Sequence, residues 1–374
     1  MIYVYGSNFS LTYNRPHSEP IMQRDLVAAF NTIGRPAVAV WGGESGIIEG
    51  VPHAHIHTLD PSPDDILFMI HGLNGALVAK NPGYANLRQM RRRLLYTSVE
   101  FPESSHPGVM SAWGQFYQHI FLECAAHVPA IQSSVSPVPV EHCQLGCTLD
   151  VDLSSLPDPY LTDGKHLFFA GRLVGTSLDR LQRLIAAMPS DMHVWVAASV
   201  TNLSSQSERW PGCTVAVLEL DDRAPSVHGD QVWLGCADSC DLLRSLLGAD
   251  PRIHVLGPMT YGSLWSYRHH AFACIDFGFP PEWARVANNC KVLDLVRAGS
   301  RIAAEGWSPT HYLIDKYNAG GKVPYGDTAA LIRMLASWQP EPVAVKQRRG
   351  TEAAIGESWL ARMPMILAAI DAIR

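Results

Sequence analysis

The sequence lacks several features that define large classes of proteins. Its 374 residues contain no apolar run of membrane-spanning length and no basic-then-apolar leader at Met1. It has eight cysteines, but no two have the C-x-x-C spacing typical of zinc and redox sites. Charged residues make up only 17% and the net charge is −6, which argues against a dedicated nucleic-acid-binding protein. We therefore expect a soluble, cytoplasmic protein with reduced thiols; peripheral contact with a membrane surface is the alternative these absences leave.

Length and composition indicate two globular domains. A chain of 374 residues is longer than a single domain with one hydrophobic core usually is. Its 47% of hydrophobic residues are enough for two hydrophobic cores. Strand-like and helix-like segments alternate throughout, which predicts an α/β fold with parallel sheets. Ser, Pro and Asp cluster between Leu153 and Gly164. We therefore expect a first domain at residues 1–155, a second at 165–350, and a helix at 351–374 that returns to the first domain.

Individual elements follow from apolar runs and periodicity. Buried strands are predicted at 2–6, 37–41, 66–72 and 94–100 in the first half, and at 167–173, 194–198, 232–235, 253–259 and 271–277 in the second. The amphipathic pattern from Val109 to Ala126 predicts one long helix. The last helix, from about Ser358 to Ile373, contains Pro364, which we expect to kink it.

Two segments of the second half carry basic residues where anions bind in α/β proteins. Lys291 opens a short amphipathic helix that ends before Gly299, and backbone N–H groups at a helix start attract anions. Arg172 stands in Gly171-Arg172-Leu173, at the C-terminal end of a predicted strand, where ligands bind in open sheets. The alternative is an exposed lysine and a surface salt bridge.

These segments resemble the donor-binding domain of GT-B glycosyltransferases, which often reads N-x-K-h-h-D (h, apolar) on the helix and G-R-L at the strand end. The run from Gly320 to Asp327 resembles the G-G-h-V-p-y-G-D segment of the same superfamily. The resemblance implies two Rossmann-like domains with parallel sheets facing across a cleft, and a C-terminal helix crossing back. It implies transfer of a sugar from a nucleotide-diphosphate donor, with a UDP-sugar the expected one, and no cofactor.

The resemblance also implies which side chains bind the donor: Arg172, Thr176 and Lys291 at the diphosphate, Asp294 at the ribose, and Pro258, Met259 and Tyr261 at the nucleobase, with Asn289 as a further donor-binding residue. Gly6, in a strand-to-helix turn, would approach the phosphates from the first domain. The first glutamate of the family's Glu-x7-Glu motif would fall at Val286. The chain departs there from the large retaining group.

The first domain offers three candidate catalytic residues. His71 follows a buried strand, and a histidine there often faces the sugar in GT-B clefts. An inverting enzyme needs a carboxylate base on the acceptor hydroxyl, for which Glu100 and Glu103 are the candidates. A retaining enzyme needs no such base, so the stereochemistry stays open. The alternative for each acid is a solvated loop charge.

Two patterns resemble metal ligands. His53, His55 and His57 share one face if the segment is a strand, but only one acid is near. The only D-x-D, Asp150 to Asp152, abuts the linker instead of ending a buried strand. We expect no metal, because two basic side chains can neutralise a diphosphate leaving group.

The acceptor is not visible in the sequence, and neither is the oligomeric state. The resemblance implies a cell-surface glycan or a lipid-linked sugar. Hydroxymethylated DNA bases, as modified by some phage GT-B enzymes, are an alternative supported only by a basic cluster, namely Arg88, Arg91, Arg92 and Arg93. A nucleotide-sugar 2-epimerase and a non-catalytic sugar-nucleotide-binding subunit are further alternatives.

Overall fold

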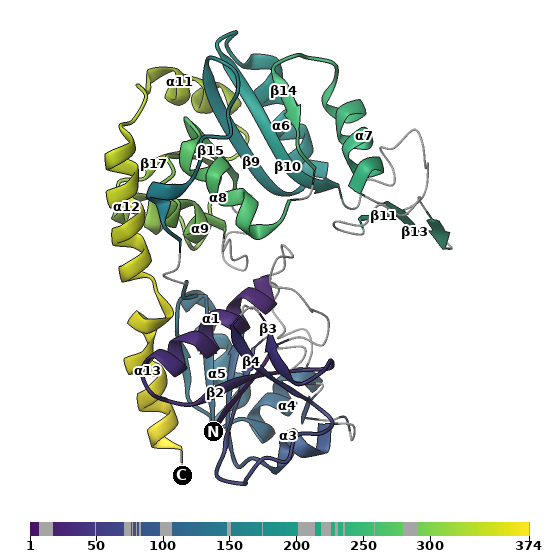
Figure 1. The fold of residues 1–374 in the computed structure, drawn as a ribbon, viewed down its shortest axis with the longest axis vertical. Helices are drawn as coiled ribbons and strands as arrows, with labels where there is room; N and C mark the ends of the chain where they lie inside the picture. Colours follow the sequence, from purple (N-terminus) through teal and green to yellow (C-terminus); the bar gives the residue numbers. More distant parts are fainter. Residues whose placement is uncertain are drawn as a thin grey trace.

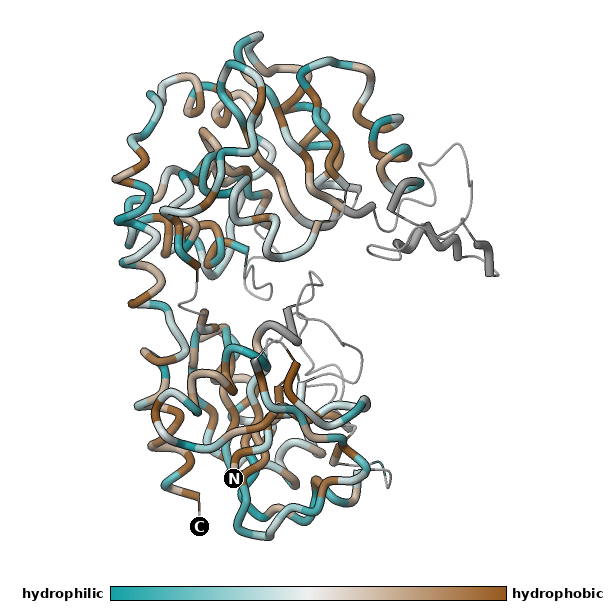
Figure 2. The backbone as a smooth tube through the Cα atoms, in the orientation of Figure 1, coloured by the Kyte–Doolittle hydropathy of each residue, from teal (hydrophilic) through white to brown (hydrophobic). Residues whose placement is uncertain are grey.

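A computed structural model of the chain supplies the coordinates. It describes residues 1–6, 18–48, 50–70, 76, 78–79, 81, 84–97, 107–147, 151–173, 175–200, 214–217, 226–228, 231–234, 236–257, 259–279 and 291–373. The described residues form two α/β lobes joined along one side by the C-terminal helices (Figure 1). Apolar residues gather along the strands of both lobes (Figure 2). No helix of these residues is long and apolar enough to cross a membrane.

The first domain is built on an eight-stranded sheet in the order β3-β4-β2-β1-β5-β6-β7-β8. Only β3 and β4 pair antiparallel. The strands are β1 Ile2–Tyr5, β2 Ala37–Trp41, β3 Gly46–Ile48, β4 Val51–His55, β5 Ile66–Ile70, β6 Arg92–Thr97, β7 His119–Leu122 and β8 Val140–His142. The helices are α1 Ser18–Thr32, α3 Ala85–Gln89, α4 Pro107–Phe116 and α5 Val128–Val135, with a 3-10 turn η3 at Ala125–His127.

The second domain has a six-stranded, fully parallel sheet in the order β14-β10-β9-β15-β16-β17. Its strands are β9 Lys165–Leu173, β10 Met192–Val200, β14 Ile253–Val255, β15 Ala273–Phe277, β16 Ile302–Glu305 and β17 Gly320–Val323. Its helices are α6 Gly175–Ala187, α7 Cys236–Leu247, α8 Tyr261–His270, α9 Lys291–Arg297, α10 Tyr312–Lys316, α11 Thr328–Ser337 and α12 Val343–Gly356, with a 3-10 turn η4 at Leu153–Ser155. Strands buried on both faces explain the continuous apolar runs of the sequence.

One predicted element was wrong, and one predicted strand lies in a sheet of its own. The expected helix from Val109 to Ala126 ends at Phe116, and the following residues form β7. All four residues of β7 are buried, so this run belongs inside a sheet and not on one face of a helix. The strand predicted at 232–235 is β13 Gln231–Leu234, which lies outside the six-stranded sheet. It pairs with β11 Thr214–Val217 and β12 Ser226–His228 in a separate small sheet.

The last helix, α13 Trp359–Ala372, packs on the first domain (Figure 1). The Trp359 ring is 1% exposed and meets the Tyr96 ring edge-on at 5.3 Å between centroids. At the far end of the helix, the Arg92 guanidinium donates to the carbonyl of Ile370. The first domain is therefore completed by the end of the chain.

The chain crosses between the domains twice, and the two crossings are hydrogen bonded to each other. The amide of Cys147 donates to the carbonyl of Glu357 at 2.9 Å, and the amide of Trp359 donates to the carbonyl of Cys147 at 3.1 Å. The helical path is interrupted at Glu357, between α12 and α13, while Pro364 lies inside α13. The last helix was predicted to begin near Ser358, and α13 begins at Trp359. The interruption lies where the backbone of Glu357 pairs with the other crossing, and a kink at Pro364 stays a prediction.

The Glu357 carboxylate ties the crossing to both domains. It is 1% exposed and accepts from Lys316 Nζ at 2.5 Å, from the Tyr317 hydroxyl at 2.8 Å and from Arg362. Burial alone would raise the pKa of Glu357, but the hydrogen bonds from Lys316 and Tyr317 and the charge of Arg362 bring it below its usual value. Lys316 belongs to α10 and Arg362 to α13, so one carboxylate joins helices of the two domains.

The Ser- and Pro-rich linker packs on the second domain. Leu153 lies so close to Gly350 of α12 that a Cβ on the glycine would come within 2.3 Å of its Cδ1 atom. The Tyr160 ring stacks on His166 with centroids 4.4 Å apart, and its hydroxyl donates to the carbonyl of Tyr267 at 2.7 Å. The segment from Leu153 onward is thus held against the second domain, although its composition suggested a free linker.

We predict that Trp359→Ala lowers the free energy of unfolding by about 4 kcal/mol, because it leaves a large cavity between α13 and the first sheet. Chemical denaturation followed by circular dichroism measures the loss. The control is Leu161→Ala, whose side chain is 90% exposed and whose loss we expect to stay within about 0.5 kcal/mol. Equal stabilities for the two variants would contradict the packing of α13.

We predict that Glu357→Gln lowers the free energy of unfolding by about 2 kcal/mol at neutral pH, because it removes a buried charge with cationic partners. The pKa of Glu357 in the folded protein lies below its value in the unfolded chain, which is about 4.3. The ionised carboxylate therefore stabilises the folded protein at pH values above the unfolded pKa. The difference between wild type and variant should shrink as the pH falls through the folded pKa. Denaturation at pH 7, 5 and 3 tests this.

The control is Glu352→Gln on α12, whose carboxylate is 61% exposed and pairs with Arg348 at 3.9 Å. We expect this control to change stability by less than about 0.5 kcal/mol at every pH. A Glu357→Gln effect independent of pH would contradict the electrostatic account.

Candidate functional site

The site forms where Gly171, near the end of β9, meets the first residue of α9. A Cβ on Gly171 would lie 2.2 Å from Lys291 Nζ, so the ammonium sits directly against the glycine backbone. Gly171 also has φ +137°, in the region that side chains rarely adopt. Two motifs that are 120 residues apart in the sequence therefore meet at one edge of the sheet, and the glycine permits it.

Arg172 and Thr176 occupy the same edge. Arg172 is the penultimate residue of β9, and Thr176 is exposed in the first turn of α6. The side chain of Arg172 lies outside the described residues, so its role as a diphosphate contact stays a prediction. Three residues therefore lie at the carboxyl edge of the sheet: Arg172, whose backbone position is described, Lys291 and the exposed Thr176.

Asp294 is held by two side chains of α8. One of its oxygens accepts from the Tyr261 hydroxyl at 2.9 Å and the other from Arg268 at 3.3 Å. Burial raises the pKa of Tyr261 well above its usual value, so the phenol is a donor at neutral pH. The sequence predicted Asp294 on the donor ribose and Tyr261 in the nucleobase wall. In the structure the two residues bind each other, and Met259, the residue two positions before Tyr261, is partly buried against the core.

The end of α9 faces the first domain. Burial alone would lower the pKa of Arg297, but the Cys147 thiol, the Tyr261 hydroxyl and the carboxylates of Asp294 and Asp25 together raise it. Asp25 lies on α1, and Cys147 is the last described residue of the first domain before the linker. Because groups of both domains act on Arg297, the C-terminal end of α9 lies close to the first domain.

A buried ion pair and a buried histidine–aspartate hydrogen bond lie next to this edge, and no sequence pattern above predicted them. Arg180 donates to Glu305 at 3.4 Å and to the carbonyl of Gly278 at 3.0 Å, and both side chains are at most 4% exposed. His311 and Asp276 are both buried and lie 2.8 Å apart. Glu305 and Asp276 stand at or next to the carboxyl ends of buried strands. An acidic residue at the end of an apolar strand is visible in the sequence, and this pattern could have indicated the two buried pairs.

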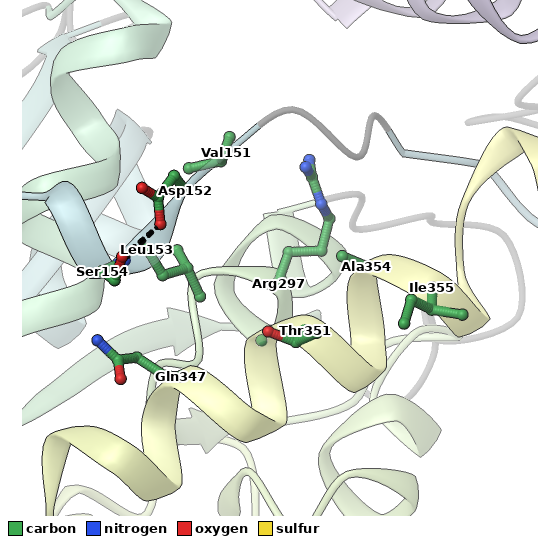
Figure 3. A pocket seen from close by; sticks show the side chains of 10 residues that line it. Val151, Asp152, Leu153, Ser154, Arg297, Gln347, Thr351, Ala354 and Ile355 are labelled. Carbon is green, nitrogen blue, oxygen red and sulfur yellow. Dashed lines mark hydrogen bonds between the residues drawn. The ribbon is translucent and has the colours of Figure 1, made fainter. Parts of the chain in front are cut away.

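A pocket of about 410 Å³ lies beside the domain crossing, between the linker and α12 (Figure 3). It is lined by Val151, Asp152, Leu153, Ser154, Arg297, Gln347, Gly350, Thr351, Ala354 and Ile355. The Asp152 carboxylate there accepts from the Ser154 amide and hydroxyl, at 3.0 and 2.7 Å. Since Arg297 ends α9 and Lys291 begins it, this pocket is separate from the Lys291 edge by about 10 Å.

Several predicted site residues lie outside the described residues: His71, Glu100, Glu103, Pro258 and Asn289. Gly6 is described, at the end of β1. A Cβ there would meet its nearest atoms at 3.6 Å, an ordinary contact, so no close approach within the described chain requires a glycine. These donor-side and catalytic roles stay predictions.

The two metal-like patterns have structural roles where they are described. The buried His53 ring forms a hydrogen bond with the carbonyl of Val51 at 2.8 Å and packs edge-on against Trp41. His57 lies beyond the end of β4 and is exposed. Asp152 caps η4, and Asp150 lies outside the described residues. Across the ranges the structure describes, no three His, Cys, Asp or Glu side chains are grouped to hold a metal ion.

The basic cluster is not a free patch. Arg92 binds the end of α13, and the Arg93 guanidinium lies 4.2 Å from the centroid of the Phe116 ring. Burial lowers the pKa of Arg93. Both residues begin β6 and so lie at the amino edge of the first sheet, opposite the edge where ligands bind. Arg92 and Arg93 therefore have partners within the chain, while Arg91 is exposed and Arg88 is partly exposed.

No protein-family model matches the chain, and no curated protein matches its sequence. Solved structures match it over its whole length. An α,α-trehalose-phosphate synthase (UDP-forming) from Burkholderia vietnamiensis has a TM-score of 0.65 at 10% identity, covering 100% of this chain and 98% of its own. Sucrose-phosphate synthase from Thermosynechococcus elongatus has 0.62 at 14% identity, covering 100% and 99%. Anabaena HepE, in complex with UDP and glucose, has 0.64 at 10% identity, covering 98% of each chain.

These likenesses show that the chain has the GT-B fold, as the sequence motifs implied. Two parallel-sheet domains and full coverage of both chains carry that conclusion. At 9–14% identity, they show the fold alone.

We predict that Gly171→Ala and Lys291→Ala each weaken the binding of UDP, the nucleotide in the HepE structure, at least about tenfold. A methyl group on Gly171 would displace the ammonium that we expect to bind the diphosphate. Because both changes remove the same contact, the double variant should bind no more than about twofold more weakly than Lys291→Ala. Calorimetry measures the cycle, and additive losses would contradict it. Thermal melting confirms that each variant is folded.

Proposed function

We propose that this protein is a glycosyltransferase that moves a sugar from a UDP-sugar to a hydroxyl group of a sugar acceptor. The observation that carries the proposal is the contact between Lys291 and Gly171 at the carboxyl edge of the second sheet. That contact joins the K-h-h-D helix and the G-R-L strand end, the two segments from which a GT-B donor site is built.

The chemistry of the edge fits departure of a nucleoside diphosphate. Negative charge grows on the β-phosphate as the glycosidic bond breaks, and a fixed cation stabilises that charge without reorganisation. Lys291 supplies one such cation, and Arg172 is proposed as the second. Two basic side chains make a divalent metal unnecessary, so we propose metal-independent transfer.

The matched structures support the class of donor and acceptor. HepE was solved with UDP and glucose. A further match, with a TM-score of 0.61, is described as trehalose-6-phosphate from E. coli bound with UDP-2-fluoro glucose. Three of the other matches are a trehalose-6-phosphate phosphatase N-terminal domain, a sucrose-phosphate synthase and a trehalose-phosphate synthase, whose names concern sugar phosphates. We therefore propose a sugar hydroxyl as acceptor in preference to DNA, whose only support was the basic cluster.

The catalytic group on the acceptor side is proposed from the sequence. His71 is the candidate that faces the sugar, and Glu100 or Glu103 would act as base if the enzyme inverts configuration. From the composition of the sequence, we also propose that the protein is located in the cytoplasm. Sugar nucleotides are available to an enzyme there.

A thermal-shift screen of UDP, GDP, dTDP and their sugar derivatives tests the donor. We expect UDP and one UDP-sugar to raise the melting temperature, because only ligands that bind the folded state stabilise it. Lys291→Ala should abolish the shift. The control is Lys322→Ala, whose ammonium pairs with Asp315 on the surface and which should keep the full shift. No shift with any nucleotide would contradict the proposal.

Release of UDP from the donor identified by the screen, measured with and without EDTA, tests the chemistry. We expect the rate to change less than twofold on chelation, since the cations at the site are side chains. A loss of activity that Mg²⁺ or Mn²⁺ restores would contradict metal independence while leaving transfer itself intact.

A further inference from the structure

Trp307 is an exposed aromatic residue on a buried turn. Its side chain is 42% exposed, whereas Glu305 and Ser308 on either side of it are at most 2% exposed. Among the exposed large hydrophobic side chains of the described residues, two are aromatic, Trp307 and Tyr312. Both lie on the segment that follows β16. Within the described part of the second domain, the exposed large aromatic side chains therefore follow the carboxyl end of β16.

The turn that carries Trp307 is held in place by its backbone. The amide of Phe279 donates to the carbonyl of Trp307 at 2.9 Å, and the amide of Trp307 donates back at 3.3 Å. Gly278 admits this pairing, because a Cβ there would lie 2.7 Å from the Trp307 carbonyl oxygen. Gly306 has φ +89°, which side chains rarely adopt. These two glycines fix the path of the chain under the indole.

Buried polar contacts anchor the same turn on both sides. On one side Glu305 pairs with Arg180, whose guanidinium lies between the rings of Phe277 and Tyr325, 4.8 and 4.6 Å from their centroids. On the other side His311 pairs with Asp276. A turn held this firmly presents its tryptophan at a defined position, so the exposure does not come from a loose loop.

The position of Trp307 relates it to the anion edge. Lys291 lies against Gly171 of β9, and Trp307 follows β16, with β15 between the two strands. Adjacent strands are about 4.8 Å apart, so the two strand ends are separated by about 10 Å. If the diphosphate of a ligand lies at Lys291, a sugar ring attached to it, or one on a second substrate beside it, can reach Trp307 across that distance.

We propose that the indole of Trp307 binds the face of a substrate pyranose ring. The proposal rests on the proposed function and adds a residue that determines specificity for the sugar. One face of a pyranose carries mainly C–H groups, which pack on a rigid, flat aromatic surface and leave the hydroxyl groups free for hydrogen bonds. The ring belongs either to the donor or to the acceptor; both present the same chemistry to the indole.

Calorimetry with UDP, UDP-glucose, and glucose in the presence of UDP tests the proposal on the full-length protein. Trp307→Ala should leave the affinity for UDP unchanged, because the diphosphate lies at Lys291. It should weaken binding of UDP-glucose about tenfold if the donor sugar stacks, or binding of glucose about tenfold if the acceptor stacks. Trp307→Phe keeps an aromatic face and should lose less than about threefold.

Tyr312→Ala is the matched control, because Tyr312 has similar exposure, 43%, and follows the same turn. We expect it to retain the affinities of the wild type. Equal losses in the two alanine variants would indicate a loosened turn and overturn the stacking role, as would unchanged sugar affinities in Trp307→Ala. A wild-type protein that binds neither UDP nor UDP-glucose would overturn the proposed function first, and this inference with it.

Discussion

The arrangement of the two domains depends on one short stretch of paired backbone. Cys147 on the outgoing crossing exchanges hydrogen bonds with Glu357 and Trp359 on the returning one. Gly146 makes room for this pairing, since a Cβ there would lie 2.4 Å from the Trp359 ring. The two crossings therefore act as one connection, and rotation of one domain against the other has to pivot there. The carboxylate of Glu357 adds side-chain contacts to both domains at the same point.

The candidate site includes helix α9 of the second domain, and the connection at Cys147 and Glu357 joins this domain to the first. Lys291 and Arg297 stand at opposite ends of α9, and they have different surroundings. Lys291 lies against the backbone of Gly171, where an anion can approach, whereas Arg297 is 3% exposed among groups of both domains. We propose the first cation as a ligand contact, whereas the second is buried near groups of both domains. The charges buried beneath the sheet edge are paired within the protein, as burial requires.

Much of the fold could be predicted from the sequence because it follows from local patterns. Buried parallel strands read as continuous apolar runs, and the G-R-L and K-h-h-D segments fell on a strand end and a helix start as expected. The stretch at His119–Leu122 was misassigned because apolar residues on both faces also fit part of a helix. The start of the last helix near Ser358 was predicted, but the pairing of Glu357 with Cys147 was not, because Cys147 is far away in sequence.

The site was less predictable than the fold, for a related reason. A motif states which residue types are present but not which side chains already bind each other. Asp294 matches the family position, but the sequence did not show that Tyr261 and Arg268 donate hydrogen bonds to its two oxygens. Arg92 and Arg93 formed a cluster in the sequence, yet one binds a helix end and the other an aromatic ring. Partners brought together from distant segments decide such roles, and no local pattern reports them.

The docking of α13 on the first sheet has a consequence for how the protein is made. Synthesis proceeds from the N-terminus, so the first sheet leaves the ribosome long before residues 359–372 exist. Until then, the surface that Trp359 and Ile366 cover is exposed to solvent. The domain that is synthesised first is therefore completed only by a helix that is synthesised after the second domain.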